Sequence, residues 1–324
     1  MEAVRFFADQ DRATEFFVQI RWPDGVTCPH CGSTNVHYLA NQRRWKCAVN
    51  HPRRQFSAKV GTIFEESPLP LDKWLVAIWL ETNAKNSISS YEVGRALGIT
   101  QKSAWFLLHR VRHALHVGSF DKKLCGTVEA DETFIGGLAK NMHKSRRAKV
   151  VKGVVGSNKT TVMGLLERHS EKGKSKVRAT VIPNTTTATL TGEIVKFVVP
   201  GSNVYTDAWQ AYRRMPEEYT HAFVDHMEAY VKGAVHTNGL ENFWSLLKRC
   251  IKGTHISVEP FHMAAYVDSE AFRFNNRDVK DADRFLRALG SVSGKRITYD
   301  ALTGGPTLDR IESGRDGANE RPNC

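Results

Sequence analysis

The stretch Val128-Glu129-Ala130-Asp131-Glu132-Thr133-Phe134 places three acidic residues inside an apolar, strand-like run that ends at Gly136-Gly137. Because successive side chains point to opposite faces of a strand, Glu129 and Asp131 are expected on one face and Glu132 on the other. Charged groups inside an apolar strand are unusual unless they are paired or bind a metal. The stretch therefore predicts a β-strand that carries a carboxylate site at Asp131.

Two more acidic residues stand in similarly distinctive surroundings. Asp207 follows a second strand-like run, and Glu241 lies near the start of a predicted helix. Together with Asp131 they suit a cluster that holds two Mg²⁺ or Mn²⁺ ions for phosphodiester chemistry, since hard divalent cations prefer oxygen ligands. Two alternatives stay open. Asp207 also fits a turn, and Glu241 also fits the third helical position of a capping box whose N-cap is Asn238.

Basic residues accompany this acidic cluster. Lys248 follows Glu241 by two helical turns, so both side chains point the same way and the lysine is expected to hold a DNA phosphate near the metal site. A basic loop between the first two strands contains Lys144, Arg146 and Arg147. These residues are expected to follow the backbone of a bound DNA.

The elements around these residues follow the order of a known architecture. Strands are expected at 126–135, 161–167, 177–182, 203–206 and 221–224, and helices at 187–197 and 240–250. Three strands, a helix, a strand and a later helix are the order of an RNase H-like fold. In that fold, acidic residues from the first and fourth strands meet one from the late helix. The expected class is α/β, with a mixed five-stranded sheet and helices in a catalytic domain over 121–280.

Cysteine spacing predicts a zinc ribbon within residues 1–66, after an N-terminal helix. Cys28 and Cys31 form a Cys-x2-Cys turn, and Cys47 follows a short strand-like run. This clustering, in a chain without a secretion signal, indicates tetrahedral Zn²⁺ rather than disulfides. His51 is the expected fourth ligand by a Cys-x3-His spacing, with His30 as the competing candidate. The metal would supply most of the stability of so small a ribbon. The alternative is three free cysteines on a surface loop.

Between the ribbon and the catalytic domain, residues 67–120 read as helical. Residues 71–82 have the apolar spacing of an amphipathic helix. Ser89 or Ser90 can cap a second helix, Gly98 permits a turn, and Thr100 can cap a third helix that ends near Leu115.

The last two of these helices form a helix-turn-helix pattern. The start of the second helix of that pair would read base edges through Gln101, Lys102 and Ser103. Its later turns would bind phosphates through Arg110 and Arg112. A helical hairpin with a purely structural role is the alternative.

Composition agrees with a globular protein that binds nucleic acid. The 324 residues are 41% hydrophobic, which argues against a disordered chain, and carry a formal net charge of +12, which favours a polyanionic partner. No apolar run is long enough for a transmembrane helix, and the N-terminus lacks the layout of a signal peptide. A cytoplasmic protein with no membrane partner is expected. Residues 281–324 are expected to form a C-terminal extension whose polar, Gly-rich tail is disordered.

A set of short stretches resembles the bacterial insertion-sequence transposases of the fifteen-ninety-five group, which combine a zinc ribbon, a helix-turn-helix and a DDE domain. The matching stretches are Cys28-Pro-His-Cys-Gly, Gln55-Phe-Ser with Gly61-Thr-Ile-Phe and Trp74, Ala104-Trp-Phe-Leu-Leu-His-Arg, Glu129-Ala-Asp-Glu-Thr-Phe-Ile-Gly-Gly, Tyr205-Thr-Asp-Ala-Trp-Gln-Ala-Tyr, His236-Thr-Asn-Gly-Leu-Glu-Asn-Phe-Trp-Ser-Leu-Leu-Lys-Arg and Phe272-Arg-Phe-Asn-Asn-Arg. The resemblance implies a DDE triad of Asp131, Asp207 and Glu241 with Lys248 as its companion. It departs at the second zinc knuckle, which usually ends in cysteine where this chain has His51-Pro52.

The resemblance implies a metal-dependent enzyme that cleaves and joins double-stranded DNA. Its expected partners are the terminal inverted repeats of its element and the target DNA, bound as a homodimer or larger assembly associated with the nucleoid of a bacterium. One alternative is a DNA-binding regulator with a zinc ribbon and helix-turn-helix, and another is a structure-specific nuclease that cleaves without joining. A repurposed transposase without catalytic activity is the third.

Overall fold

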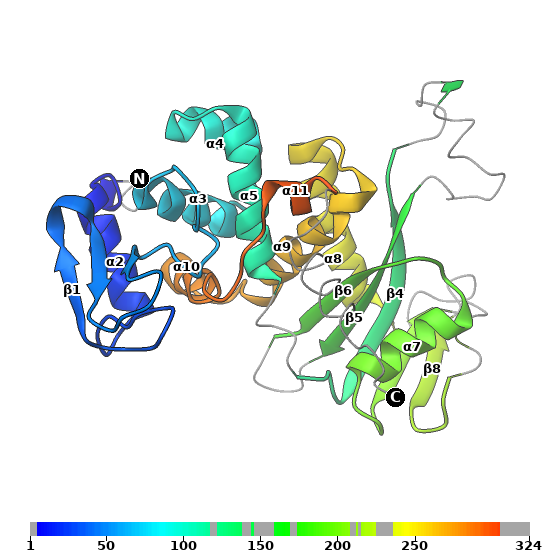
Figure 1. The fold of residues 1–324 in the computed structure, drawn as a ribbon. Helices are drawn as coiled ribbons and strands as arrows, with labels where there is room; N and C mark the ends of the chain where they lie inside the picture. The colour runs from blue at the N-terminus through cyan, green and yellow to red at the C-terminus, as the bar shows by residue number, and fades with distance from the viewer. Residues whose placement is uncertain are drawn as a thin grey trace, which may run out of the picture. The chain divides into compact units, whose positions relative to one another are not determined.

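The computed structural model describes residues 5–116, 122–137, 144–145, 159–168, 174–207, 212, 215–224 and 236–304. Two compact units are present. The first comprises Met1–Trp79, Ser90–Ala114 and Ala288–Cys324, and the second comprises Leu80–Ser89 and Leu115–Arg287 (Figure 1). Since each unit is drawn from separate stretches of chain, the domain boundaries expected near residues 66, 120 and 280 remain predictions.

The second unit is built on a mixed five-stranded sheet, as the sequence predicts. The strands pair in the order β6-β5-β4-β7-β8. Strand β4 is antiparallel to β5, and β5 is antiparallel to β6, whereas β4, β7 and β8 run parallel to one another. The strands are β4 (Thr127–Ile135), β5 (Thr160–Arg168), β6 (Lys176–Ile182), β7 (Asn203–Asp207) and β8 (Thr220–Val224).

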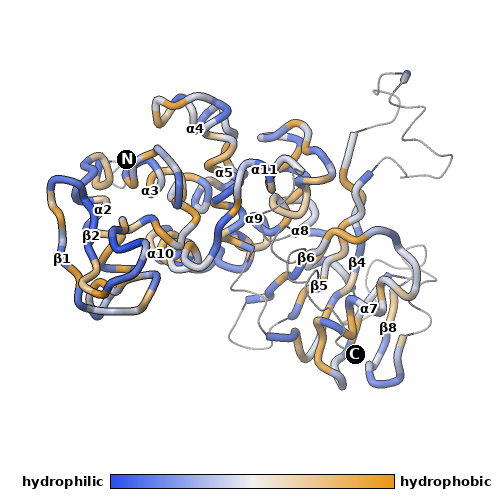
Figure 2. Tube along the Cα trace, in the orientation of Figure 1, coloured by the Kyte–Doolittle hydropathy of each residue, from blue (hydrophilic) through white to orange (hydrophobic). Residues whose placement is uncertain are grey.

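Helices cover both faces of this sheet. Helix α7 (Thr187–Phe197) packs on one face, while α8 (Asn238–Arg249) and α9 (Met263–Asn275) pack on the other (Figure 1). Hydrophobic stretches lie along the strands and α7 (Figure 2). Side chains of β4 alternate between the two cores. Val128 and Ala130 face α7, whereas Glu129 and Asp131 contact α8.

The N-terminal part of the first unit has the layout of a zinc ribbon. Helix α2 (Gln10–Arg21) begins after Asp9, whose carboxylate accepts the N–H groups of Asp11 and Arg12. An antiparallel sheet follows, with the strands β1 (Val36–Leu39), β2 (Arg44–Cys47) and β3 (Gln55–Phe56) and a 3-10 turn, η1 (Ala40–Gln42). Packed aromatic rings supply its core, including those of Phe17 and Phe64, whose centroids lie 5.1 Å apart.

The predicted helices of the central region are present. They are α3 (Leu71–Asn83), α4 (Ser90–Leu97) and α5 (Gln101–Leu115). Gly98 has a φ of +62°, a conformation that glycine adopts without strain. Thr100 Oγ1 accepts the N–H of Ser103 at 3.1 Å, which confirms Thr100 as the cap of α5.

Beyond α8 the chain continues through η4 (Cys250–His255), a π-helix, and η5 (Pro260–His262) into α9, then through α10 (Asp281–Gly290) and α11 (Tyr299–Leu302). The start of the expected C-terminal extension is therefore helical. The segment expected to be disordered lies outside the described residues after Gly304. Within the described residues, no helix combines the length and the apolar character needed to cross a lipid bilayer.

Candidate active site and metal centre

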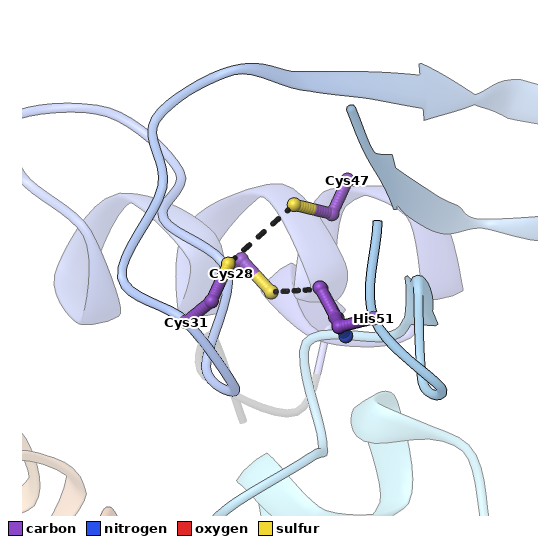
Figure 3. A group of neighbouring side chains, drawn as sticks. All are labelled: Cys28, Cys31, Cys47 and His51. Atoms are coloured by element: carbon purple, nitrogen blue, oxygen red, sulfur yellow. Dashed lines mark hydrogen bonds between the residues drawn. The ribbon is translucent and has the colours of Figure 1, made fainter. Parts of the chain in front are cut away.

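Four side chains converge in the zinc ribbon. Cys28 and Cys31 come from the loop before β1, Cys47 ends β2, and His51 lies in the loop after it (Figure 3). Their ligand atoms all lie within 4.8 Å of one another. The structure thus brings together the four predicted residues, and His51 rather than His30 completes the set.

The distances within this group fit a tetrahedral metal. Cys31 Sγ lies 3.6 Å from Cys47 Sγ, and Cys28 Sγ lies 3.5 Å from His51 Nε2. A tetrahedron with Zn–S bonds of about 2.3 Å has edges of about 3.8 Å, and a Zn–N bond shortens them slightly. Three thiolates and one imidazole are also a donor set that zinc prefers. The cluster therefore fits a structural Zn²⁺.

Asp131 lies at the centre of the second site. It is on β4, and its Oδ2 accepts a hydrogen bond from the indole Nε1 of Trp244 on α8 at 2.8 Å. Burial, together with the neighbouring charges of Asp207 and Glu241, raises the pKa of Asp131 to about 6, although the Trp244 N–H opposes this shift. The charges of both other acids act on Asp131, so the three predicted carboxylates share one neighbourhood.

Strand pairing explains how Asp207 reaches Asp131. Strands β4 and β7 are parallel, and Glu129 pairs with Tyr205. Continuing this register by two residues puts Asp131 level with Asp207, which is the last residue of β7. Residues two apart share a face, so both carboxylates point to the α8 side of the sheet.

Helix α8 brings Glu241, and a glycine allows the helix to approach. Gly164 on β5 pairs with Asp131. A Cβ atom built on Gly164 would lie 2.6 Å from Trp244 Cζ2 and 2.7 Å from Leu240 Cδ2. Only a residue without a side chain leaves room for the ring of Trp244 beside Asp131. Glu241 lies one turn before Trp244 on the same helix and is exposed.

The start of α8 is anchored by an ion pair between the buried Glu129 and the part-buried Arg168. Glu129 is 1% exposed, and its Oε2 accepts the backbone N–H of Leu240 at 2.9 Å. Its Oε1 accepts a hydrogen bond from Arg168 Nε at 2.6 Å. Arg168 also donates through its Nη2 to the carbonyl oxygen of His236 at 2.5 Å. A carboxylate at a helix N-terminus interacts favourably with the helix dipole, so Glu129 and Arg168 fix where α8 begins.

Glu132 lies on the other face of β4, as the alternation predicts. The hydroxyl group of Tyr212 donates a hydrogen bond to Glu132 Oε1. Burial and the charges of Asp131 and Asp207 raise the pKa of Glu132 to about 7. Glu132 therefore lies near the site without facing α8.

The alternative role for Glu241, the third helical position of a capping box with Asn238 as N-cap, does not fit helix α8. Helix α8 begins at Asn238, so Thr237 is its N-cap, and the Thr237 side chain forms no capping hydrogen bond. Asn238 is the first helical residue instead of the cap. Lys248 lies two turns after Glu241 and is half-buried.

Comparison with known proteins agrees with this arrangement. Residues 123–275 match the model of an ISXO2-like transposase domain, and residues 8–49 match a transposase zinc-ribbon domain. An "Uncharacterized protein in transposable element ISH50" of Halobacterium salinarum is 25% identical over 279 residues, which cover 82% of this chain and 91% of that protein. An "Uncharacterized transposase-like protein" of Haemophilus influenzae is 32% identical over 117 residues, which cover 36% of this chain and 94% of that protein. The chain belongs to the ISXO2-like transposase family. Membership implies nucleotidyl-transfer chemistry and DNA binding.

The matched regions of this transposase contain the predicted carboxylate site and most of the zinc ligands. Asp131, Asp207, Glu241 and Lys248 lie within the first match. The three cysteine ligands lie within the second, and His51 follows its end by two residues. The helices α4 and α5 lie between the two matched regions. Neither family match therefore bears on the role of these two helices.

Two arginines of α5 are not placed as expected. Arg110 is 3% exposed; its Nη2 donates to the carbonyl oxygen of Glu65 at 2.6 Å, and its guanidinium lies 5.4 Å from the ring centroid of Trp74. Arg112 is also buried. The expectation that these two residues bind phosphate is wrong for this structure, because both side chains are buried. The apolar spacing of α5 does not predict the burial of these two arginines, since arginine is rarely fully buried.

The start of α5 is only partly open. Gln101 is half-buried and donates to Ser90 Oγ at 2.9 Å, while the Oγ of Ser103 lies 2.9 Å from Thr100 Oγ1. Lys102 is exposed, with its Nζ 5.2 Å from the ring centroid of Tyr299. In the basic loop, Lys144 is exposed, and the expected phosphate contacts of Arg146 and Arg147 lie outside the described residues.

The sequence did not indicate the residues that support the carboxylates. Trp244, Gly164 and Arg168 are the main ones. Trp244 stands one helical turn from Glu241, which is a usable signal for a neighbour on the same helix face. The roles of Gly164 and Arg168 cannot be predicted until the register of β4 and β5 is known.

Proposed function

We propose that this protein is an active DNA transposase that cleaves the ends of its element and joins them to target DNA. The observation that supports the proposal most directly is that Asp207 on β7 and Glu241 on α8 lie near enough to Asp131 on β4 for their charges to raise its pKa. The chain's membership of a transposase family supports it. The freed 3′-hydroxyl group would attack a target phosphodiester in line with the bond that breaks.

The same three residues would hold Mg²⁺. They offer only oxygen donors, which suit a hard divalent cation, and they come from separate elements fixed by the sheet and by α8. When bound, a pair of such ions would activate the attacking oxygen and stabilise the leaving oxygen. Trp244 would orient Asp131 for this task by holding its Oδ2. Lys248 would bind a phosphate beside the site.

Binding of the element's terminal inverted repeats is assigned to the first unit and the basic loop. At the start of α5, Lys102 would contact DNA, with Gln101 and Ser103 beside it. Lys144, Arg146 and Arg147 would follow a DNA backbone. Two ends must be cut and joined together, so a dimer or larger assembly on DNA is part of the proposal.

A strand-transfer assay tests the proposal. The substrate is a labelled duplex carrying the inverted repeat that flanks the coding sequence, with Mg²⁺ or with EDTA. The wild type is expected to give a joined product only with Mg²⁺, and Asp131→Ala is expected to bind the duplex without cleaving it. Binding by the wild type without cleavage or joining would instead favour a regulator or an inactive relative.

A further inference from the structure

An exposed apolar tip follows helix α8. Ile256 comes directly after the π-helix η4 and is 83% exposed. Its φ is +63° and its ψ is −55°, and the N–H of Ser257 bonds to the carbonyl oxygen of His255 at 2.6 Å. This tight three-residue turn is strained, and a β-branched residue rarely adopts it. The chain thus holds a large apolar side chain in water on an unfavourable backbone.

Neighbouring residues hold this turn in place. Thr254 Oγ1 donates to the carbonyl oxygen of Asn86 at 2.7 Å, and His255 Nε2 lies 3.2 Å from Ser87 Oγ. Ser87 in turn donates to Glu81, which is fully buried. Strained turns and π-helices persist where surrounding contacts impose them, and both recur at functional sites. The tip of Ile256 is therefore a fixed feature of the second unit.

Exposed cations lie along the chain near the tip. Arg249 directly precedes η4, Lys252 lies within it, and Lys85 is next to Asn86, which contacts Thr254. Among the described residues, none of these three cations forms an ion pair. Residues 248–262 contain a single acid, Glu259. A second exposed apolar side chain, Phe261, is 66% exposed and follows Ile256 by five residues.

We propose that Ile256 and Phe261 form an apolar wedge that contacts DNA bases beside the proposed active site, while Lys85, Arg249 and Lys252 bind the flanking phosphates. Duplex DNA is the polyanion that also offers an apolar interior, and apolar side chains inserted at base steps are a known way to open it. Helix α8 links the two places, since eight residues separate Glu241 from Arg249, about 12 Å along a helix. This inference rests on the proposed function and locates part of the DNA path for it.

Variants at the tip separate a DNA role from a structural one. Ile256→Gly removes the side chain and relieves the backbone, because glycine adopts a positive φ without strain. Its melting temperature is expected to equal or exceed that of the wild type, while its Kd for the inverted-repeat duplex without added Mg²⁺ weakens about tenfold, the effect of losing one buried isoleucine. Val195→Ala, at an exposed apolar position on α7, is the matched control and is expected to bind normally.

Salt dependence distinguishes the two kinds of contact. Lys252→Ala is expected to reduce the slope of log K against log salt by about 0.9, as for one lost phosphate contact. Ile256→Gly is expected to leave that slope unchanged. With 2-aminopurine at successive base steps of the duplex, the wild type is expected to raise the fluorescence at one step, and Ile256→Gly is expected to abolish the rise.

These experiments distinguish failure of the wedge from failure of the proposed transposase activity. If the wild type binds and raises the fluorescence but never cleaves with Mg²⁺, the proposed function fails and the wedge stands. The wedge is overturned if Ile256→Gly binds the duplex, with its fluorescence rise, as the wild type does. It is also overturned if Ile256→Gly changes only the sedimentation mass of the free protein, because the tip would then join copies of the chain.

Discussion

Trp244 donates its indole N–H to Asp131 Oδ2 at 2.8 Å, which ties the helix that carries Glu241 to the central strand of the sheet. The bond holds one oxygen of the Asp131 carboxylate. It also favours the charged form of Asp131, which burial opposes. The orientation and the charge of this carboxylate therefore depend on a residue that cannot bind a metal itself.

Replacing Trp244 by phenylalanine tests this dependence. The variant Trp244→Phe keeps an aromatic ring over Gly164 but removes the donor. The Mg²⁺ concentration for half-maximal cleavage is expected to rise about 10- to 100-fold, the range for loss of a residue that orients a metal ligand. A Mg²⁺ titration measures this shift. Trp74→Phe is the control, since the indole nitrogen of Trp74 is buried without a described hydrogen-bond partner. An unchanged Mg²⁺ requirement in Trp244→Phe would show that the hydrogen bond from Trp244 does not orient Asp131 for metal binding.

A methyl group at Gly164 is expected to disturb the same contact. The Cβ atom of Gly164→Ala would lie 2.6 Å from Trp244, so α8 or the strand must shift, and overpacking of this kind costs about 1–3 kcal/mol. Cleavage is expected to fall along with the urea midpoint. The control is Gly192→Ala, because nothing lies within 4 Å of a Cβ built there on α7. A mid-helix glycine-to-alanine change is expected to stabilise by about 0.5–1 kcal/mol. Equal midpoints for both variants would contradict the close packing.

The ion pair of Glu129 and Arg168 predicts non-additive effects. Glu129→Leu removes the carboxylate that pairs with the part-buried Arg168 guanidinium and is expected to lower the free energy of unfolding by about 2–4 kcal/mol. The double variant with Arg168→Met removes both charges and is expected to be less destabilised than Glu129→Leu alone. Urea denaturation of the two single variants and the double variant measures the coupling. Additive losses would mean that the two side chains act independently.

Most of the sheet was predictable because its side chains follow simple periodicities. The alternation along β4 separated Glu129 and Asp131 from Glu132, and the expected order of strands and helices agrees with the structure. The zinc ligands were predictable from spacing alone, since a short turn fixes two of them. These features depend on residues that are near one another in the sequence.

Contacts between distant elements were not predictable in the same way. Gly164 matters only because β5 pairs with β4 beside Trp244, and this register is invisible in the sequence. Arg110 looked like a phosphate ligand because arginine is usually exposed, but its guanidinium satisfies the carbonyl oxygen of Glu65 inside the first unit. For both Gly164 and Arg110, the role of the residue depends on a tertiary contact. The local sequence pattern does not encode that contact.

Stability without divalent ions is expected to depend on Asp131. Burial raises the pKa of Asp131 from an ordinary value of 3.8 to about 6, so the folded protein favours the protonated form. Its contribution to stability is therefore present below about pH 4 and is lost as the pH rises to about 6, a change on the order of 2–3 kcal/mol. Without added Mg²⁺, the difference in unfolding free energy between Asp131→Asn and the wild type is expected to grow in favour of the variant across this range. A difference that stays constant with pH would show that Asp131 does not titrate as stated.

The two neighbouring histidines of the zinc ribbon predict opposite results. His51 Nε2 lies 3.5 Å from Cys28 Sγ within the ligand cluster, whereas His30 is outside the cluster although its ring centroid is 5.8 Å from that of His51. His51→Ala is therefore expected to lower bound zinc well below one per chain after dialysis against a mild chelator, and His30→Ala is expected to retain it. Zinc content by mass spectrometry measures both variants. Since the metal supplies much of the folding energy of a small ribbon, the near-ultraviolet circular dichroism of its buried Trp45 is expected to weaken with the loss of zinc. His51→Cys restores a fourth ligand and is expected to recover both signals, which separates loss of coordination from a general disturbance of the loop. Retention of zinc by His51→Ala, with loss in His30→Ala, would assign the fourth position to the other histidine.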